Sequence, residues 1–405
     1  TKRRITAINY FKAEPLMTTD FCNSKYDRRK LLFHPRAIAD ILEKGDTWPV
    51  TVNTGFTTYC NHSCIWCSTA YTTRIKPTLK ERDDLLIQPD VWIKNIRLLA
   101  KNGTKGLIIA GQGEPLLHPK ADIMLEAVAE SNLKYMLFSN GQKLHEKYYD
   151  SFFRSGLAVR FSVDAATTEM HEKWHAAESE NGKGRSNFSK VLDNIAALVA
   201  EKKRRNSNLP HIGCQMICSS MTQPDFENFA KLFKQIGVDY VVYKSLQSNP
   251  GTRGLIASSL SIHNSLEERS EYATNMLREL ESIKAKYQSP TFDVFIKNAQ
   301  IESAYVKEFN GAENYQKCRA HSLTPMIEPD GKVYLCVDHG GVESMVIGNI
   351  YEQTIEEIWL SEKRKQVIES IDLVNKCPAG CFLDEANILL EELSSPNDSL
   401  HWQLI

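Results

Sequence analysis

The sequence predicts an α/β protein with six parallel strands. Two observations carry this prediction. The first is that, from residue 50 onward, short apolar runs of strand length alternate with longer amphipathic segments of helix length. The second is the spacing of this alternation, which is typical of parallel βαβ units. Six strands are short of a closed eight-stranded barrel, so a partial (β/α)6 barrel and an open sheet both fit the pattern.

The expected elements follow one another in chain order. Strands are expected at residues 48–53, 106–110, 135–138, 158–163, 211–218 and 240–243. Helices are expected at residues 120–131, 143–155, 188–203 and 225–236. In the 188–203 segment, for example, Val191, Ile195 and Leu198 recur at helical spacing.

The pattern changes after the sixth strand. A serine-rich segment predicts a loop at 245–262, and a helix is expected at 267–286. A β-hairpin is then expected at 325–336, with helices at about 353–369 and 383–394. The chain is expected to divide into an N-terminal segment (1–49), the α/β unit (50–250), a linker loop and helix (251–304) and a C-terminal domain (305–405).

Composition excludes several classes of protein. The 405 residues include 49 Lys and Arg against 50 Asp and Glu, a net charge of −1, so we expect no nucleic-acid partner. No apolar run approaches 18 residues, so we expect no membrane span. The first six residues lack the apolar core of a secretion signal. Ten clustered cysteines in a large chain indicate metal ligands rather than disulfides, which predicts a cytoplasmic location.

Three cysteines form the strongest motif. Cys60, Cys64 and Cys67 have the spacing C-x3-C-x2-C just after the first expected strand. Three thiolates on one short loop can converge on one metal site. A structural zinc site needs four ligands, and His62 would be the candidate fourth. A four-iron cluster also has four corners, so three cysteines would leave one iron open to an exogenous ligand.

This triplet resembles that of the radical S-adenosylmethionine (SAM) superfamily, whose fold is a partial (β/α)6 barrel. The resemblance implies that the open iron of a [4Fe–4S] cluster chelates SAM. One electron then cleaves SAM, and the 5′-deoxyadenosyl radical abstracts a hydrogen atom from a small-molecule substrate. It also implies a flavodoxin- or ferredoxin-type electron donor.

The second expected strand ends in a further match to the family. The segment Ala110-Gly-Gln-Gly-Glu-Pro115 is similar to the family's Gly-Gly-Glu-Pro motif. By this resemblance Gly111, Gly113 and Glu114 bind SAM, because glycines allow the backbone to approach a ligand closely. A glycine turn at a strand end is the structural alternative.

The next two strand ends and one aromatic residue complete the expected SAM pocket. Phe138-Ser-Asn-Gly141 resembles the family's Thr-Asn-Gly, and this resemblance implies that Asn140 binds SAM. Phe161-Ser-Val-Asp-Ala165 resembles the family's Ser-x-Asp-Gly/Ala motif, and this resemblance implies that Ser162 and Asp164 bind SAM. Trp66 precedes the third cysteine, where the family often places an aromatic residue against the adenine. Turn capping by Asn140 and Asp164, and core packing of Trp66, are the alternatives.

A second set of cysteines follows near the C-terminus. Cys318, Cys336, Cys377 and Cys381 flank the expected hairpin and the helix after it. Four thiolates can close a complete site for zinc or for an iron–sulfur cluster. The hairpin and the segment after it resemble the SPASM/twitch extensions of radical SAM enzymes. Four cysteines imply the twitch type, with one auxiliary [4Fe–4S] cluster.

Further candidates lie on the last two strands. Cys214 and Cys218 are four residues apart on one strand and therefore share a face. If that face lines the barrel, either thiol could donate a hydrogen atom to a substrate radical; otherwise both are small core residues. Lys244 and Gln247, at the end of the sixth strand, are candidate substrate contacts.

Three functions fit these features. The first is a radical SAM enzyme acting on a sugar, aminocyclitol or nucleotide sugar, because residues 28–35 resemble the segment that precedes the core in carbohydrate and natural-product enzymes. The outcome would be dehydrogenation, dehydration or deamination, or epimerisation. The second is a peptide-modifying maturase. The third is a noncatalytic iron–sulfur electron carrier, against which the SAM-binding motifs argue.

Overall fold

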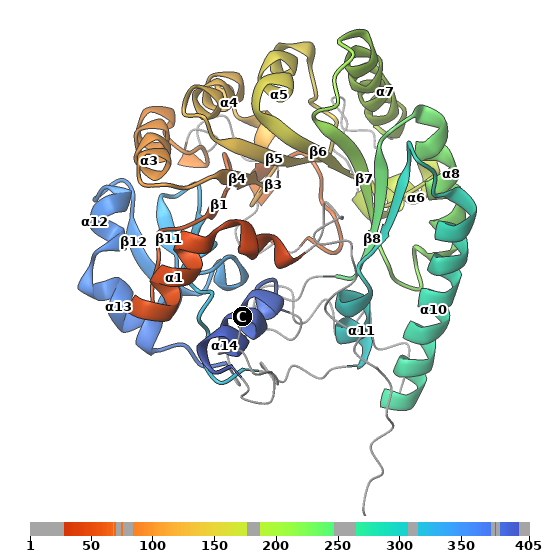
Figure 1. Cartoon of the computed structure of the whole chain (residues 1–405). Helices are drawn as coiled ribbons and strands as arrows, with labels where there is room; N and C mark the ends of the chain where they lie inside the picture. Colours follow the sequence, from red (N-terminus) through yellow and green to blue (C-terminus); the bar gives the residue numbers. More distant parts are fainter. Residues whose placement is uncertain are drawn as a thin grey trace, which may run out of the picture.

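The computed structural model describes residues 28–67, 69, 74–75, 84–175, 187–246, 265–306, 315–373, 377 and 381–396. Its centre is a ten-stranded sheet in the order β12-β11-β10-β1-β4-β5-β6-β7-β8-β9. The sheet curves into an arc, with α3, α4, α5, α7, α8 and α10 along its outer side (Figure 1). The α/β class and the partial barrel predicted from the sequence are confirmed.

All six predicted strands are present and pair in parallel. They are β1 (Thr51–Thr54), β4 (Gly106–Ile109), β5 (Lys134–Ser139), β6 (Gly156–Ser162), β7 (His211–Ile217) and β8 (Tyr240–Lys244). The helices between them are α3 (Pro89–Lys101), α4 (Ala121–Glu130), α5 (Tyr149–Ser155), α6 (Thr168–His175), α7 (Phe188–Arg204) and α8 (Phe226–Ile236). The helix expected at 143–155 begins only at residue 146, as the 3₁₀ turn η3 (Glu146–Tyr148) followed by α5.

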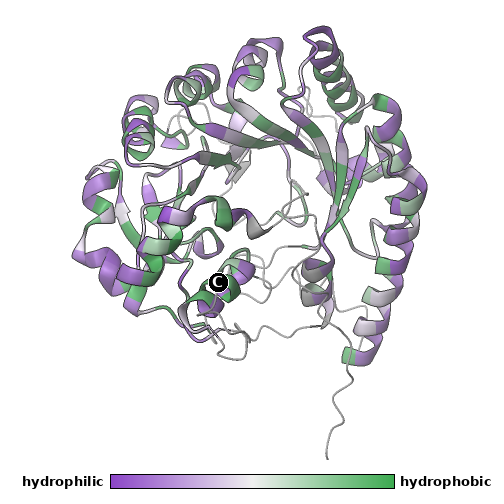
Figure 2. Cartoon of the chain, in the orientation of Figure 1, coloured by the Kyte–Doolittle hydropathy of each residue, from purple (hydrophilic) through white to green (hydrophobic). Residues whose placement is uncertain are grey.

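Strand register decides which side chains face the barrel interior. Phe161 pairs with Cys214, and Cys214 with Val241; all three belong to the core packed against the helices. Because side chains alternate along a strand, the neighbouring residues Ser162 and Gln215 face the interior. Apolar residues are concentrated where sheet and helices meet, and the outer helix faces are hydrophilic (Figure 2).

The sheet continues beyond the six predicted strands at one edge. After α10 (Leu266–Tyr287), β9 (Asp293–Ile296) pairs in parallel with β8, and α11 (Asn298–Val306) follows. The sequence analysis places this segment in the linker, because a strand of four residues is too short to show a clear alternation of apolar and polar side chains. The loop expected at 245–262 lies almost wholly outside the described residues.

The predicted hairpin forms and extends the other edge. β10 (Met326–Ile327) and β11 (Lys332–Tyr334) are antiparallel, and β12 (Val346–Asn349) pairs with β11. β10 also pairs in parallel with β1, so the C-terminal strands and the barrel share one sheet. The helix expected at 353–369 is two helices, α12 (Ile355–Trp359) and α13 (Glu362–Glu369), because Ser361 caps the second.

The ends of the described chain pack together. The 3₁₀ helix η1 (Arg28–Phe33) and α1 (Pro35–Lys44) lie against α14 (Asp384–Ser394), with Leu31, Ile41 and Leu390 buried between them. Arg364 makes a two-pronged ion pair with Asp46, at 2.6 Å for each nitrogen–oxygen contact. None of the described helices is long and apolar enough to cross a membrane.

Candidate active site

The cysteine triplet lies at the carboxyl end of the parallel sheet. Cys60 ends the short strand β2 (Tyr59–Cys60), and Cys64 and Cys67 follow in a turn closed by a 3.2 Å backbone hydrogen bond between them. Burial raises the pKa of the Cys64 thiol, and the neighbouring Cys60 and Cys67 raise it further. Three cysteine thiols on one short loop form a donor set that fits a metal cluster.

Helix α6 holds this loop in place. The backbone N–H groups of Ser63 and Ile65 donate to the carbonyls of His175 (2.9 Å) and Trp174 (3.3 Å). The Trp66 ring packs on the Trp174 ring with 5.2 Å between centroids. The predicted adenine contact is therefore buried against an aromatic partner that the sequence analysis does not identify.

Three buried histidines meet beside the loop. His62, His171 and His175 each place a ring nitrogen within 4.8 Å of the others. Burial and the charge of His175 lower the pKa of His62 to about 3. Nε2 of His62 lies 3.1 Å from the side-chain oxygen of Gln142. His62, the alternative fourth zinc ligand, thus packs with the histidines of α6.

Glu114 ties two strand ends together. Its carboxylate accepts hydrogen bonds from the Ser139 hydroxyl (2.8 Å), the Asn140 N–H (2.7 Å) and the Leu116 N–H (3.1 Å). Burial raises its pKa to about 7, although these donors favour the charged form. A Cβ atom at Gly113 would collide with the Tyr59 backbone, so this glycine permits close approach of the motif to β2.

The asparagine of the next strand end joins the same network. The Asn140 amide donates to the Asn61 side chain at 2.9 Å, and its oxygen accepts from the Gln142 N–H at 3.0 Å. Asn61 also donates to the side chain of Gln142. The sequence analysis does not include Asn61, although it directly follows the first cysteine.

Ser162 and Asp164 are both engaged within the protein. The Ser162 hydroxyl accepts from the Gln215 amide at 3.0 Å. Asp164 has a positive φ of 54° and accepts from the Ile217 N–H at 2.7 Å, and its other oxygen lies 3.3 Å from Nε2 of His175. The structure thus connects Asp164 with the cysteine loop through His175, whereas the printed contact of Ser162 is with β7.

The two remaining cysteines lie on the helix side of the sheet. Cys214 and Cys218 are fully buried in the core that includes Phe229 of α8. This placement favours their alternative interpretation as core residues, because the barrel interior is on the opposite face. Lys244 does face the interior, and Gln247 lies outside the described residues.

The second set of cysteines converges on one pocket. Cys318, Cys336, Cys377 and Cys381 line it together with Tyr315, His321, Asp338, His339 and apolar side chains. Burial and the nearby Cys318 raise the pKa of Cys377 to about 12. Four thiols in one largely apolar pocket fit a fully cysteine-ligated cluster.

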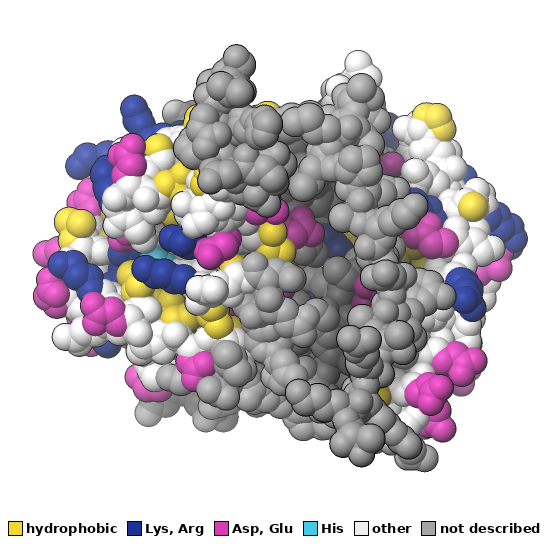
Figure 3. Space-filling view, turned by 60° about the horizontal axis from the view of Figure 1, so that its bottom comes forward, with side chains coloured by type: hydrophobic (Ala, Val, Ile, Leu, Met, Phe, Trp, Pro, Cys, Tyr) yellow, Lys and Arg dark blue, Asp and Glu magenta, His cyan; other side chains and the backbone are white. Residues whose placement is uncertain are grey.

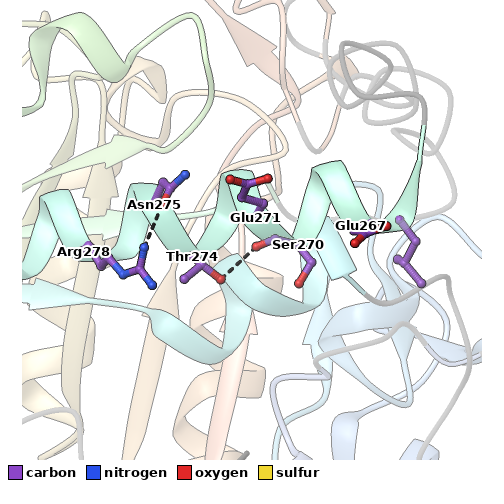
Figure 4. Close-up of a pocket in the computed structure, with 7 residues that line it drawn as sticks. Glu267, Ser270, Glu271, Thr274, Asn275 and Arg278 are labelled. Atoms are coloured by element: carbon purple, nitrogen blue, oxygen red, sulfur yellow. Dashed lines mark hydrogen bonds between the residues drawn. The ribbon is translucent and has the colours of Figure 1, made fainter. Parts of the chain in front are cut away.

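A second, shallow groove has a different character. It runs along α10 and is lined by Leu266, Glu267, Ser270, Glu271, Thr274, Asn275 and Arg278 (Figure 4). Arg278 donates to the side chain of Asn275 at 2.9 Å, and Thr274 to the Ser270 carbonyl at 2.9 Å. This groove presents neither cysteine nor histidine and has no part in the candidate site.

Comparison with known proteins agrees with both cysteine sites. The family description of the radical SAM superfamily matches residues 54–213, and that of the SPASM iron–sulfur cluster-binding domain matches residues 318–382. The chain thus contains a radical SAM domain. More specifically, it carries a C-terminal SPASM domain, and the two domains imply a SAM-binding [4Fe–4S] cluster and an auxiliary cluster.

Solved structures share the fold at low sequence identity. Streptococcus suis SuiB bound to S-adenosylmethionine matches at 13% identity and a TM-score of 0.61, covering 88% of this chain and 78% of SuiB. SuiB bound to its precursor peptide SuiA matches at 14% and 0.61, covering 93% and 81%. Native anSMEcpe with AdoMet and a bound peptide matches at 16% and 0.54, covering 84% and 88%. No curated protein sequence matches the chain.

Proposed function

We propose that this enzyme cleaves SAM reductively and abstracts a hydrogen atom from a small polar substrate, a sugar, aminocyclitol or nucleotide sugar. The observation that carries the proposal is the grouping of Cys60, Cys64 and Cys67 beside the interior ends of β4, β5 and β6. When bound, the cluster supplies the electron that cleaves SAM to the 5′-deoxyadenosyl radical.

The chain's own residues bind and orient in this proposal. Cys60, Cys64 and Cys67 hold the cluster, and the backbone at Gly111 and Gly113 lies against SAM. Trp66 packs on the adenine. Ser162 and Asp164, at the end of β6, bind the polar groups of SAM. Asn140 and Glu114 keep the strand ends in register through their shared hydrogen bond.

Dehydrogenation of a secondary alcohol is the proposed outcome. The four-cysteine pocket gives the protein a place to accept an electron, which oxidation of a substrate radical requires. Dehydration or deamination requires a neighbouring leaving group, and epimerisation requires a hydrogen donor. The helix-side position of Cys214 and Cys218 favours the first two outcomes over epimerisation.

A peptide substrate is the second candidate. SuiB and anSMEcpe have this fold and have been solved with bound peptides. Their low sequence identity to this chain supports a common fold alone. Peptide maturation is therefore kept as the alternative function of this chain. Polar side chains on the interior face, Arg160 and Lys244 among them, support a small polar substrate as the first choice.

The proposal is tested by SAM cleavage. Anaerobically reconstituted protein is incubated with dithionite and SAM, and 5′-deoxyadenosine is quantified by chromatography. Cys64→Ala should abolish product, whereas Cys318→Ala should retain uncoupled cleavage because it alters only the second site. A protein that carries both clusters and forms no 5′-deoxyadenosine would be an electron carrier.

A further inference from the structure

The side chain of Gln112 crosses from the candidate SAM-binding segment to the C-terminal domain. Gln112 stands between Gly111 and Gly113 in the segment after β4, and its side chain is fully buried. Its amide nitrogen donates to Oε1 of Glu328 at 3.3 Å and lies 3.8 Å from the sulfur of Met326. Glu328 directly follows β10, the strand that joins the C-terminal domain to the barrel. A buried hydrogen bond therefore connects the two domains beside the expected SAM pocket.

The strand order places Gln112 and Glu328 on either side of β1. The last residue of β1 pairs with Ile327 of β10 and with Ile109 of β4. Gly55 follows it and so lies between Glu328 and the segment after β4. A Cβ atom at Gly55 would displace Oε1 of Gln112. The missing side chain therefore leaves the space that Gln112 needs to reach Glu328 across β1.

Glu328 is itself fixed in position by the C-terminal hairpin. Its backbone N–H donates to the Lys332 carbonyl, and its carbonyl accepts from the Gly331 N–H, both at 2.9 Å. The Tyr334 hydroxyl of β11 also hydrogen-bonds its side chain. Seen from below, the described outer surface carries acidic and basic side chains intermixed (Figure 3), whereas the Glu328 side chain is 2% exposed. A carboxyl group buried to this extent depends on hydrogen bonds within the protein.

The segment that carries Gln112 is anchored on its other side to the cysteine loop. The Glu114 N–H donates to the Tyr59 carbonyl at 2.9 Å, and Tyr59 directly precedes Cys60. The backbone at Gly113 packs so closely on Tyr59 that no Cβ atom would fit. The segment is thus held between the first cluster site and the C-terminal hairpin. A shift at either contact would move the backbone that the proposed function places against SAM.

We propose that Gln112 is a positioning residue through which the C-terminal domain sets the affinity of the barrel for SAM. Its hydrogen bond to Glu328 fixes the backbone at Gly111 and Gly113 in the conformation that SAM requires. The inference rests on the proposed function and on its assignment of these two glycines to SAM. It predicts that a substitution in the C-terminal hairpin weakens SAM binding while both clusters remain.

The test is equilibrium binding of SAM to unreduced holoenzyme, so that no turnover is needed. Gln112→Met keeps the length of the side chain and removes the amide donor, and Glu328→Met removes the acceptor. Each should weaken SAM binding by about fivefold to tenfold, the loss expected from one buried hydrogen bond. The double variant should lose no more than either single variant, because both changes remove the same contact. Gln366→Met, at an exposed position of α13, is the matched control and should change nothing.

An exchange of the two side chains separates positioning from a general loss of packing. Gln112→Glu alone sets two carboxyl groups against each other and should bind SAM more weakly than Gln112→Met. The addition of Glu328→Gln reverses donor and acceptor, and should restore SAM affinity to within about twofold of the wild type. Iron content should stay at the wild-type value in every variant.

Three results would overturn the inference and leave the proposed function standing. The first is wild-type SAM affinity in Gln112→Met and Glu328→Met. The second is an exchange variant that binds SAM as weakly as Gln112→Glu, because residue 112 would then contact SAM itself. The third is a loss of iron in step with SAM affinity, which would place the effect in the clusters. Absence of 5′-deoxyadenosine from reduced wild-type enzyme would instead refute the proposed function, whatever the binding data show.

Discussion

The Sγ atom of Cys64 lies 3.1 Å from Nδ1 of His175, the last residue of α6. The other ring nitrogen of His175 lies 2.7 Å from the carbonyl of Val163, just after β6. One imidazole therefore bridges a predicted cluster ligand and the end of a barrel strand. A residue 111 positions along the chain fixes the orientation of this cysteine.

Replacing His175 with alanine should loosen the first cluster site selectively. The Cys64 side chain would lose its polar contact and gain a cavity beside it, so iron should dissociate faster from this site than from the SPASM pocket. Iron content and the electron paramagnetic resonance signal of the reduced protein measure this. Glu169→Ala, at an exposed position of the same helix, is the matched control. Equal iron loss from both sites would mean that His175 serves the fold in general.

Replacing all three cysteines of the loop should remove about half of the iron. Two four-iron clusters require about eight irons per chain, so the Cys60, Cys64 and Cys67 triple alanine variant should retain about four. SAM cleavage should disappear. Metal analysis after anaerobic reconstitution measures this, and stoichiometric zinc with about four irons in the wild type would contradict the auxiliary cluster.

Ser162→Ala should weaken SAM binding and leave iron content unchanged. The substitution removes a hydroxyl at the end of β6 and leaves the Gln215 amide without its acceptor. A loss of about fivefold to tenfold in SAM affinity is expected from one polar contact. Equilibrium binding of SAM to holoenzyme measures it, with Ser131→Ala, at the C-terminus of the outer helix α4, as the control. Unchanged affinity would contradict the assigned role of Ser162.

Glu114→Gln should change how stability depends on pH. The folded-state pKa of Glu114 is raised from 4.5 to about 7, so between these values the folded protein binds a proton that the unfolded chain does not. Wild-type stability should therefore fall as pH rises through this window, by about 3 kcal/mol in total. Urea unfolding at pH 5.5 and pH 8 should show a smaller fall in the Gln variant. Parallel curves would show that the carboxyl stays ionised throughout.

Cys218→Ala should cost stability and spare SAM cleavage. Its sulfur is buried among core residues on the helix side, so the small cavity should lower the free energy of unfolding by about 1 kcal/mol. Formation of 5′-deoxyadenosine should match the wild type. A variant of wild-type stability that incorporates no solvent deuterium, while the wild type does, would restore this thiol as a hydrogen donor.

Local patterns were enough to predict the barrel, and long-range contacts account for what they missed. The six strands are visible because their apolar runs and the helices between them have distinct periods. The pairing of β10 with β1 joins segments more than 270 residues apart, and no local pattern reports it. The site shows the same division: the cysteines have a diagnostic spacing, whereas Arg160 and Gln215 become neighbours only through strand register. The contact between His171 and His175 could have been predicted from the sequence, because residues four apart on a helix share a face.

The pairing of β10 with β1 bears on how the protein can be divided. A fragment that ends before Tyr315 would keep every barrel strand from β1 to β9, and would lose the strand that hydrogen-bonds to β1 along its outer side. That edge would then present unpaired N–H and C=O groups over an apolar core, which is the usual starting point for association between chains. The C-terminal domain therefore also protects the barrel from aggregation, and expression of either half alone would yield a poorly soluble product.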